Sequence, residues 1–131
     1  MSAEEHVQCF RMPALAESVA QARRHAEAAA QASGVSDVTA VVLAVSEAVS
    51  NAVLHAYSNG SPRGEIELAL TRHSRGDFVV TVTDFGNGLK PRADSPGAGL
   101  GLPLIRKLTK ELSVTDPLGG GTRVTMSFLI E

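Results

Sequence analysis

The hydrophobic residues of positions 35–60 recur at steps of three and four. Because an α-helix makes one turn every 3.6 residues, this spacing gathers them on one side of a helix. They are Val38, Val41, Val42, Val45, Val49, Ala52, Val53 and Ala56. Ser36 is the expected N-cap, with Asp37 in the first turn, where the helix dipole favours a negative charge. We therefore predict one long helix whose valine stripe faces the core.

The period then changes to two. Residues 64–72 and 78–84 alternate between hydrophobic and polar side chains, which is typical of strands with one buried face. The predicted buried positions are Ile66, Leu68, Leu70, Phe78, Val80 and Val82. Gly76 lies between the two runs and indicates a hairpin turn. Three further strands are predicted at residues 5–12, which would form an edge strand, 112–116 and 122–130.

Two more helices complete the pattern. Residues 14–33 are rich in alanine and stop before Gly34, a fitting C-cap. Residues 102–112 return to helical spacing, and Pro103 belongs in the first turn, where its missing N–H is not needed. The resulting order is β-α-α-β-β-α-β-β. It predicts an α+β fold, a two-layer α/β sandwich in which helices cover one face of a mixed, mostly antiparallel sheet.

Composition limits the classes of function. With 131 residues, 44% of them hydrophobic, the chain can form a single domain, residues 1–131, with its own core. The net charge is −2 without a block of Lys or Arg, so direct binding to nucleic acid is not expected. No apolar run approaches the ~20 residues of a membrane span. Cys9 is the only cysteine and no signal peptide is visible, so we expect a cytoplasmic protein without an internal disulfide.

Three polar residues of the long helix are candidates for chemistry. Glu47, Asn51 and His55 are four residues apart and line one edge of the helix. Polar residues opposite an apolar stripe occur on most surface helices, so an ordinary solvated face is the simpler explanation when these residues are taken alone.

Three glycine-containing motifs follow along the chain. They are Asp84-Phe85-Gly86-Asn87-Gly88 after a strand, Gly97-Ala98-Gly99-Leu100-Gly101 before a helix, and Gly120-Gly121-Thr122 before the last strand. A β-turn, a flexible loop and a hairpin turn explain each of them singly. Alternatively, a carboxylate at a strand end can accept hydrogen bonds from a ligand, and small residues let the backbone approach a phosphate. Neither the dinucleotide-binding pattern G-x-G-x-x-G nor a P-loop is present.

The order of these motifs is more specific than any one of them. E-x-x-x-N on a helix, D-x-G-x-G after a strand, G-x-G-x-G at a helix start and G-T before a final strand resemble the signature series of the GHKL ATP-binding fold. That family includes gyrase and the histidine kinases. The segments SEAVSNAVLHAY and GLGLPLIRKLTKEL, with the N-terminal strand and helix, are similar to the anti-sigma factor serine/threonine kinase branch, so the resemblance covers nearly the whole chain.

This resemblance implies a site for ATP and Mg²⁺. Asn51 would offer its side-chain oxygen to Mg²⁺, which prefers hard oxygen ligands and bridges the phosphates. Glu47 would be the general base that acts on a serine or threonine hydroxyl or on water. His55 matches a common polar position of this branch, and no catalytic role is assigned to it.

The resemblance also implies contacts with the base and the phosphates. Asp84 would accept a hydrogen bond from the adenine amino group, and Thr122 would support Asp84 or an adenine-bound water. The other implied residues are Gly86 and Gly88, which give the adenine room, and Gly99, Leu100 and Gly101, whose backbone N–H groups would bind the phosphates. Only ten residues separate Gly88 from Gly99, a shorter lid than in many relatives, so we expect weak nucleotide binding.

The leading functional hypothesis is an ATP-dependent serine/threonine protein kinase that acts as an anti-sigma factor or its regulator. It would phosphorylate a small anti-sigma-factor antagonist protein. Its partners would be a sigma factor, the antagonist or both, and the resemblance implies a homodimer. Three alternatives remain open: a non-catalytic, ATP-gated protein-binding module, a stressosome-type switch serine kinase, and the catalytic domain of a histidine kinase whose phosphoacceptor lies on a partner chain.

Overall fold

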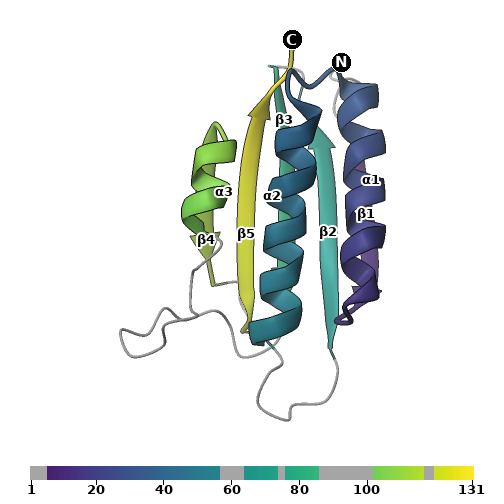
Figure 1. The fold of residues 1–131 in the computed structure, drawn as a ribbon, viewed down its shortest axis with the longest axis vertical. Helices are drawn as coiled ribbons and strands as arrows, with labels where there is room; N and C mark the ends of the chain where they lie inside the picture. The colour runs from purple at the N-terminus through teal and green to yellow at the C-terminus, as the bar shows by residue number, and fades with distance from the viewer. Residues whose placement is uncertain (1–5, 57–63, 74–75, 86–101, 117–119) are drawn as a thin grey trace.

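The computed structural model describes residues 6–56, 64–73, 76–85, 102–116 and 120–131, and these follow the predicted order of elements (Figure 1). The strands are β1 (His6–Pro13), β2 (Glu65–Arg72), β3 (Asp77–Asp84), β4 (Glu111–Thr115) and β5 (Thr122–Leu129). The helices are α1 (Glu17–Ser33), α2 (Val38–Asn51), which a π-helical segment (Ala52–Ala56) follows directly, and α3 (Leu102–Leu108). Within these ranges, no helix combines the length and apolar character that crossing a membrane requires.

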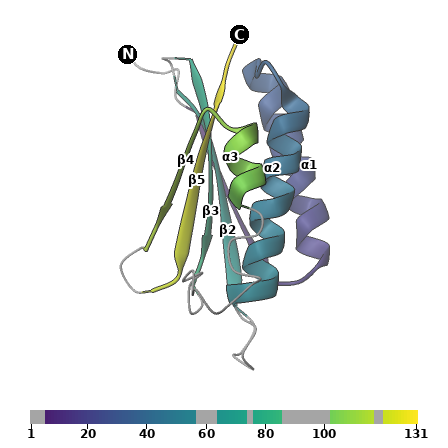
Figure 2. The same ribbon diagram turned by 60° about the vertical axis from the view of Figure 1, so that its left-hand side comes forward.

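The five strands form one sheet in the order β1-β2-β3-β5-β4, with β1 at an edge as predicted. Every pair of neighbouring strands in the described part of the sheet is antiparallel, so the expectation of a mixed sheet is wrong in that detail. Figure 2 shows all three α-helices on the same face of the sheet. The predicted α+β two-layer sandwich is confirmed.

The core lies between the sheet and the helices. Alternate residues of the central strands are buried there, as the period of two predicts: Ile66, Leu68, Leu70, Phe78, Val80, Val82, Val124, Met126 and Phe128. The helices add two rows of buried alanines, Ala40, Ala44 and Ala48 in α2 and Ala22, Ala26 and Ala30 in α1. Side chains this small let the backbones of the two helices approach closely where α1 packs against α2. The valine stripe alone did not predict the alanine row of α2.

The long helix begins one residue later than predicted. Its N-cap is Asp37, whose Oδ1 accepts a hydrogen bond from the backbone N–H of Ala40 at 3.1 Å, so the expectation for Ser36 is wrong. Aspartate and serine are both good N-caps, and the side chain that reaches a free N–H of the first turn decides between them. The α-helical hydrogen bonds end at Asn51 and continue as the π-helical segment. The predicted end near residue 60 lies outside the described residues.

The third helix is shorter than predicted and ends at Leu108. Glu111 and Leu112, which the helical spacing included, instead belong to β4 and pair with β5. The backbone N–H of Lys110 already donates to the carbonyl of Ser127 at 2.7 Å, so the strand ladder begins directly after the helix. Pairing with β5 therefore overrides the helical periodicity of these residues.

Candidate functional site

Three of the predicted site residues, Asn51, Asp84 and Thr122, stand at the end of α2, the end of β3 and the start of β5. These ends lie at the same end of the molecule (Figure 1). The π-helical segment after Asn51 contacts β3 and brings the end of α2 against that strand. β3 and β5 are antiparallel, so the last residue of β3 lies opposite the first residue of β5. That cross-strand pair is Asp84 and Thr122. The fold thus joins three positions that lie far apart in the sequence.

The pair of Asp84 and Thr122 is almost completely buried. The two residues are 2% and 1% exposed, and both follow the alternation that points core side chains toward the helices. Burial of a carboxylate costs free energy unless hydrogen bonds or charges compensate it. Both residues have interaction partners. A buried carboxylate at the end of a strand can accept a hydrogen bond from a ligand with high selectivity, because water competes little there.

Gly121 lies against this pair and has to be glycine for two reasons. Its φ of +98° falls in the left-handed region that side chains disfavour. In addition, a Cβ atom at this position would lie 2.0 Å from the carbonyl oxygen of Asp84. The sequence showed a glycine-rich turn here, but the close approach to Asp84 becomes visible only once β3 and β5 are paired. The sequence motif contains Gly121 but assigns it no role, and its close approach to Asp84 indicates one.

Asn51 and Glu47 form the helical side of the site. α2 is a regular α-helix through both residues, so they lie one turn apart on the same edge, as predicted. The Nδ2 atom of Asn51 is buried and has no hydrogen-bond partner among the described residues. A half-turn of the amide exchanges its nitrogen and oxygen, so this group can present either a donor or an acceptor to a ligand. Glu47 is half-buried, which keeps its carboxylate accessible to a substrate hydroxyl.

The remaining predicted site residues lie outside the described parts of the chain. They are Gly86, Gly88, Gly99, Leu100 and Gly101. The side chain of His55 also lies outside them, although its backbone belongs to the π-helical segment. The structure therefore brings Asp84 and Thr122 together as a cross-strand pair, and every predicted contact with a ligand remains a prediction.

This arrangement suits a ligand that carries a hydrogen-bond donor and also a cation that prefers oxygen atoms around it. The buried carboxylate can accept a hydrogen bond from an exocyclic amine. The amide at the end of α2 can meet a cation or a polar group farther along the same ligand. A nucleotide with an amino-substituted base has both features.

Comparison with known proteins supports this assignment. The sequence profile of the histidine kinase-like ATPase domain matches residues 12–128. No curated protein sequence matches the chain. Among solved structures, the chain is similar to the RsbU and RsbW domains of Rv1364c from Mycobacterium tuberculosis, with 22% sequence identity and a TM-score of 0.70. This match covers 96% of this chain and 33% of the solved chain, so this chain spans about a third of the length of that chain.

A second similar structure is the mycobacterial sensor histidine kinase MprB. It is 19% identical with a TM-score of 0.56, and the match covers 95% of this chain and 100% of that chain. Likeness at such identities shows a shared fold, whereas the profile match extends from β1 to β5 and includes every residue of the site described above. The chain therefore belongs to the histidine kinase-like ATPase domain family, the group whose motif order its sequence resembles.

Proposed function

We propose that the protein is an ATP-dependent serine/threonine protein kinase that acts as an anti-sigma factor or as the regulator of one. Its substrate is a serine on a small anti-sigma-factor antagonist protein. The observation that carries this proposal is the buried cross-strand pair of Asp84 and Thr122 at the end of β3, which the π-helical segment after α2 contacts. At the end of α2, the Nδ2 atom of Asn51 is buried and has no hydrogen-bond partner among the described residues. Membership of the ATPase family supports ATP as the nucleotide.

In this proposal the adenine ring and the phosphates of ATP occupy separate parts of the site. Asp84 accepts a hydrogen bond from the adenine amino group, and Thr122 supports that carboxylate or an adenine-bound water. The glycines at 86 and 88 leave room for the ring. Residues 99–101 (Gly99, Leu100 and Gly101) offer backbone N–H groups to the phosphates. The burial of Asp84 supports its role because an exposed carboxylate would discriminate poorly between bases.

The residues of α2 fit a bound magnesium ion and a reacting hydroxyl. Asn51 would hold Mg²⁺ through its side-chain oxygen. A half-turn of the amide would bring this oxygen to the position of the buried Nδ2, which has no partner among the described residues. When bound, Mg²⁺ neutralises charge on the phosphates. Glu47, one turn earlier on the same edge, removes the proton of the attacking hydroxyl as general base.

The proposed partners are a sigma factor, its antagonist protein or both, and the proposed state is a cytoplasmic homodimer. The similarity to the structure of the RsbU and RsbW domains of Rv1364c supports a role beside regulatory proteins. The net charge of −2 supports protein partners over nucleic acid.

The replacement Glu47→Gln tests the kinase proposal. This substitution removes the general base but keeps the size and polarity of the side chain. We therefore expect the rate of phosphotransfer from ATP to a purified antagonist to fall by at least about a hundredfold. The Kd for ATP, measured by calorimetry, should stay within about twofold because the nucleotide contacts are intact. Glu111→Gln, an exposed glutamate of β4, is the matched control and should change neither quantity.

Two results separate the competing functions. Full phosphotransfer by the Glu47→Gln protein would contradict the assignment of the base. Tight ATP binding by the wild type without transfer to any antagonist, combined with nucleotide-dependent partner binding, would instead identify an ATP-gated binding module.

A further inference from the structure

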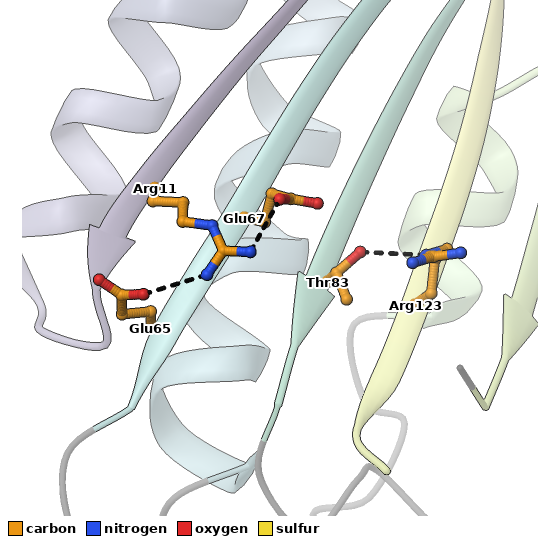
Figure 3. Close-up of polar contacts among 5 residues, drawn as sticks. All are labelled: Arg11, Glu65, Glu67, Thr83 and Arg123. Atoms are coloured by element: carbon orange, nitrogen blue, oxygen red, sulfur yellow. Dashed lines mark hydrogen bonds and ion pairs between the residues drawn. The ribbon is translucent and has the colours of Figure 1, made fainter. Parts of the chain in front are cut away.

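The face of the sheet without helices carries a fixed arginine directly behind the site. The guanidinium of Arg11 in β1 lies 3.3 Å from a carboxylate oxygen of Glu65 and 3.4 Å from one of Glu67, both in β2 (Figure 3). Its central carbon also lies 5.3 Å from the centroid of the Phe85 ring, within the range of a cation–π contact. One side chain thus links β1 and β2 to the residue that follows β3.

A second contact continues this row toward β5. Arg123 donates from its Nε to the hydroxyl of Thr83 at 3.2 Å (Figure 3). The strand register places Arg11, Glu67, Thr83 and Arg123 opposite one another in successive strands. Thr83 is only 1% exposed, although it lies on the face without helices. The row therefore forms a continuous polar layer across four strands.

This polar layer contains Thr83 and Arg123, which are the chain neighbours of Asp84 and Thr122 in the proposed adenine site. Side chains alternate between the two faces of a strand, so Thr83 and Phe85 flank Asp84 but point to the opposite face. In the same way, Arg123 follows Thr122 along β5. A shift of the Phe85 backbone would move the carboxylate of Asp84, because the two residues are adjacent in the chain.

The contacts of Arg11 are better suited to fixing geometry than to stabilising the fold. The side chains of Arg11 and Glu65 are both 57% exposed, and ion pairs this exposed stabilise a protein little. Two carboxylates and a ring nevertheless hold the planar guanidinium in one place. Phe85 is 46% exposed, so packing in the core does not fix its ring.

We propose that Arg11 is a positioning residue for base recognition. By holding the ring of Phe85, it keeps the adjacent carboxylate of Asp84 in the orientation that accepts the adenine amino group. This inference rests on the proposed nucleotide site. It assigns to the reverse face of the sheet a role in selecting ATP over nucleotides that carry a carbonyl in place of that amino group.

The test compares ATP with GTP in Arg11→Met, which removes the charge and keeps an unbranched side chain of similar length. GTP has a carbonyl at the corresponding position, and this oxygen cannot donate a hydrogen bond to Asp84. We expect the Kd for ATP to rise at least about tenfold and the Kd for GTP to change by less than about twofold, so that selectivity is lost. Lys110→Met removes another exposed cation, paired with Asp77 at 3.0 Å, and should leave selectivity unchanged.

Two further variants keep the proposal testable if Arg11→Met unfolds. Arg11→Lys keeps a cation near Phe85 and should recover part of the selectivity. Phe85→Leu should lose selectivity to a similar degree, and combining it with Arg11→Met should add little, since both act through one contact. An unchanged ratio of the two Kd values, or an equal loss for both nucleotides, would overturn the inference while the nucleotide site stands. A wild type that binds neither nucleotide would overturn the nucleotide site as well.

Discussion

At the scale of single residues, the site depends on a backbone that approaches another backbone closely. Gly121 and Gly76 have the same φ of +98°, so alanine at either position is strained to a similar extent. Their surroundings differ. A Cβ atom at 121 would lie 2.0 Å from the carbonyl oxygen of Asp84, whereas one at 76 would have no atom within 4 Å. Comparing alanine substitutions at the two positions therefore separates the effect of backbone strain from the effect of contact with Asp84.

We predict different outcomes for Gly76→Ala and Gly121→Ala. Gly76→Ala should lower the free energy of unfolding by about 1 kcal/mol, the cost of a left-handed residue, and leave the Kd for ATP unchanged. Gly121→Ala should lower it by roughly 3 kcal/mol or more and weaken ATP binding, because Asp84 has to move. Chemical denaturation and calorimetry measure the two quantities. Equal effects of both substitutions on stability and on binding would mean that the contact with Asp84 is unimportant.

At the scale of elements, the beginning of α2 shows how a local choice fixes a helix. Ser36 and Asp37 are adjacent and both suit an N-cap, but only Asp37 accepts from the N–H of Ala40. The backbone N–H of Ser36 donates to the carbonyl of Leu129, which places it in the pairing of the chain with the end of β5. Ser36 therefore contributes through its backbone N–H rather than through its side-chain hydroxyl.

This difference predicts the stability of two neighbouring variants. Asp37→Ala should lower the free energy of unfolding by about 1 kcal/mol, the usual contribution of an N-cap side chain. Ser36→Ala should change it by less than about 0.5 kcal/mol because the backbone hydrogen bond is kept. Urea denaturation of both proteins beside the wild type gives the comparison. A larger loss for Ser36→Ala would show that the cap is assigned to the wrong residue.

The elements also show which features a sequence can predict. Alternation was a reliable guide in β2, β3 and β5, since their hydrophobic residues that face the helices are buried, whereas on the other face only Thr83 and Ser127 are buried. It failed at the boundary between α3 and β4, where pairing with β5 decides the conformation of Glu111 and Leu112. The order of the motifs proposed Asp84 and Thr122 for the site, and the strand register adds that the two residues lie opposite each other. The contact between Arg11 and Phe85 was not, because it depends on the register of three strands.

At the scale of the whole molecule, the two faces of the sheet have different structural roles. The helices cover one face and form the core with it (Figure 2). Asp84 and Thr122 lie buried at the end of that face, and Asn51 is the last residue of α2. The opposite face carries the polar row of Arg11 and Arg123 behind the same strand ends (Figure 3). The sheet thus connects the proposed nucleotide site with a surface that no helix among the described residues covers.

The most direct test of the nucleotide site is a calorimetric titration of ATP and ADP into the purified protein, with and without Mg²⁺. It compares the wild type with Asn51→Ala and with Thr39→Ala, a control at the exposed start of the same helix. We predict that wild type and control bind ATP in a Mg²⁺-dependent manner, and that Asn51→Ala raises the Kd at least about tenfold. No binding by the folded wild type at millimolar nucleotide, or binding that is indifferent to both Mg²⁺ and Asn51, would contradict an ATP site at this end of the sheet.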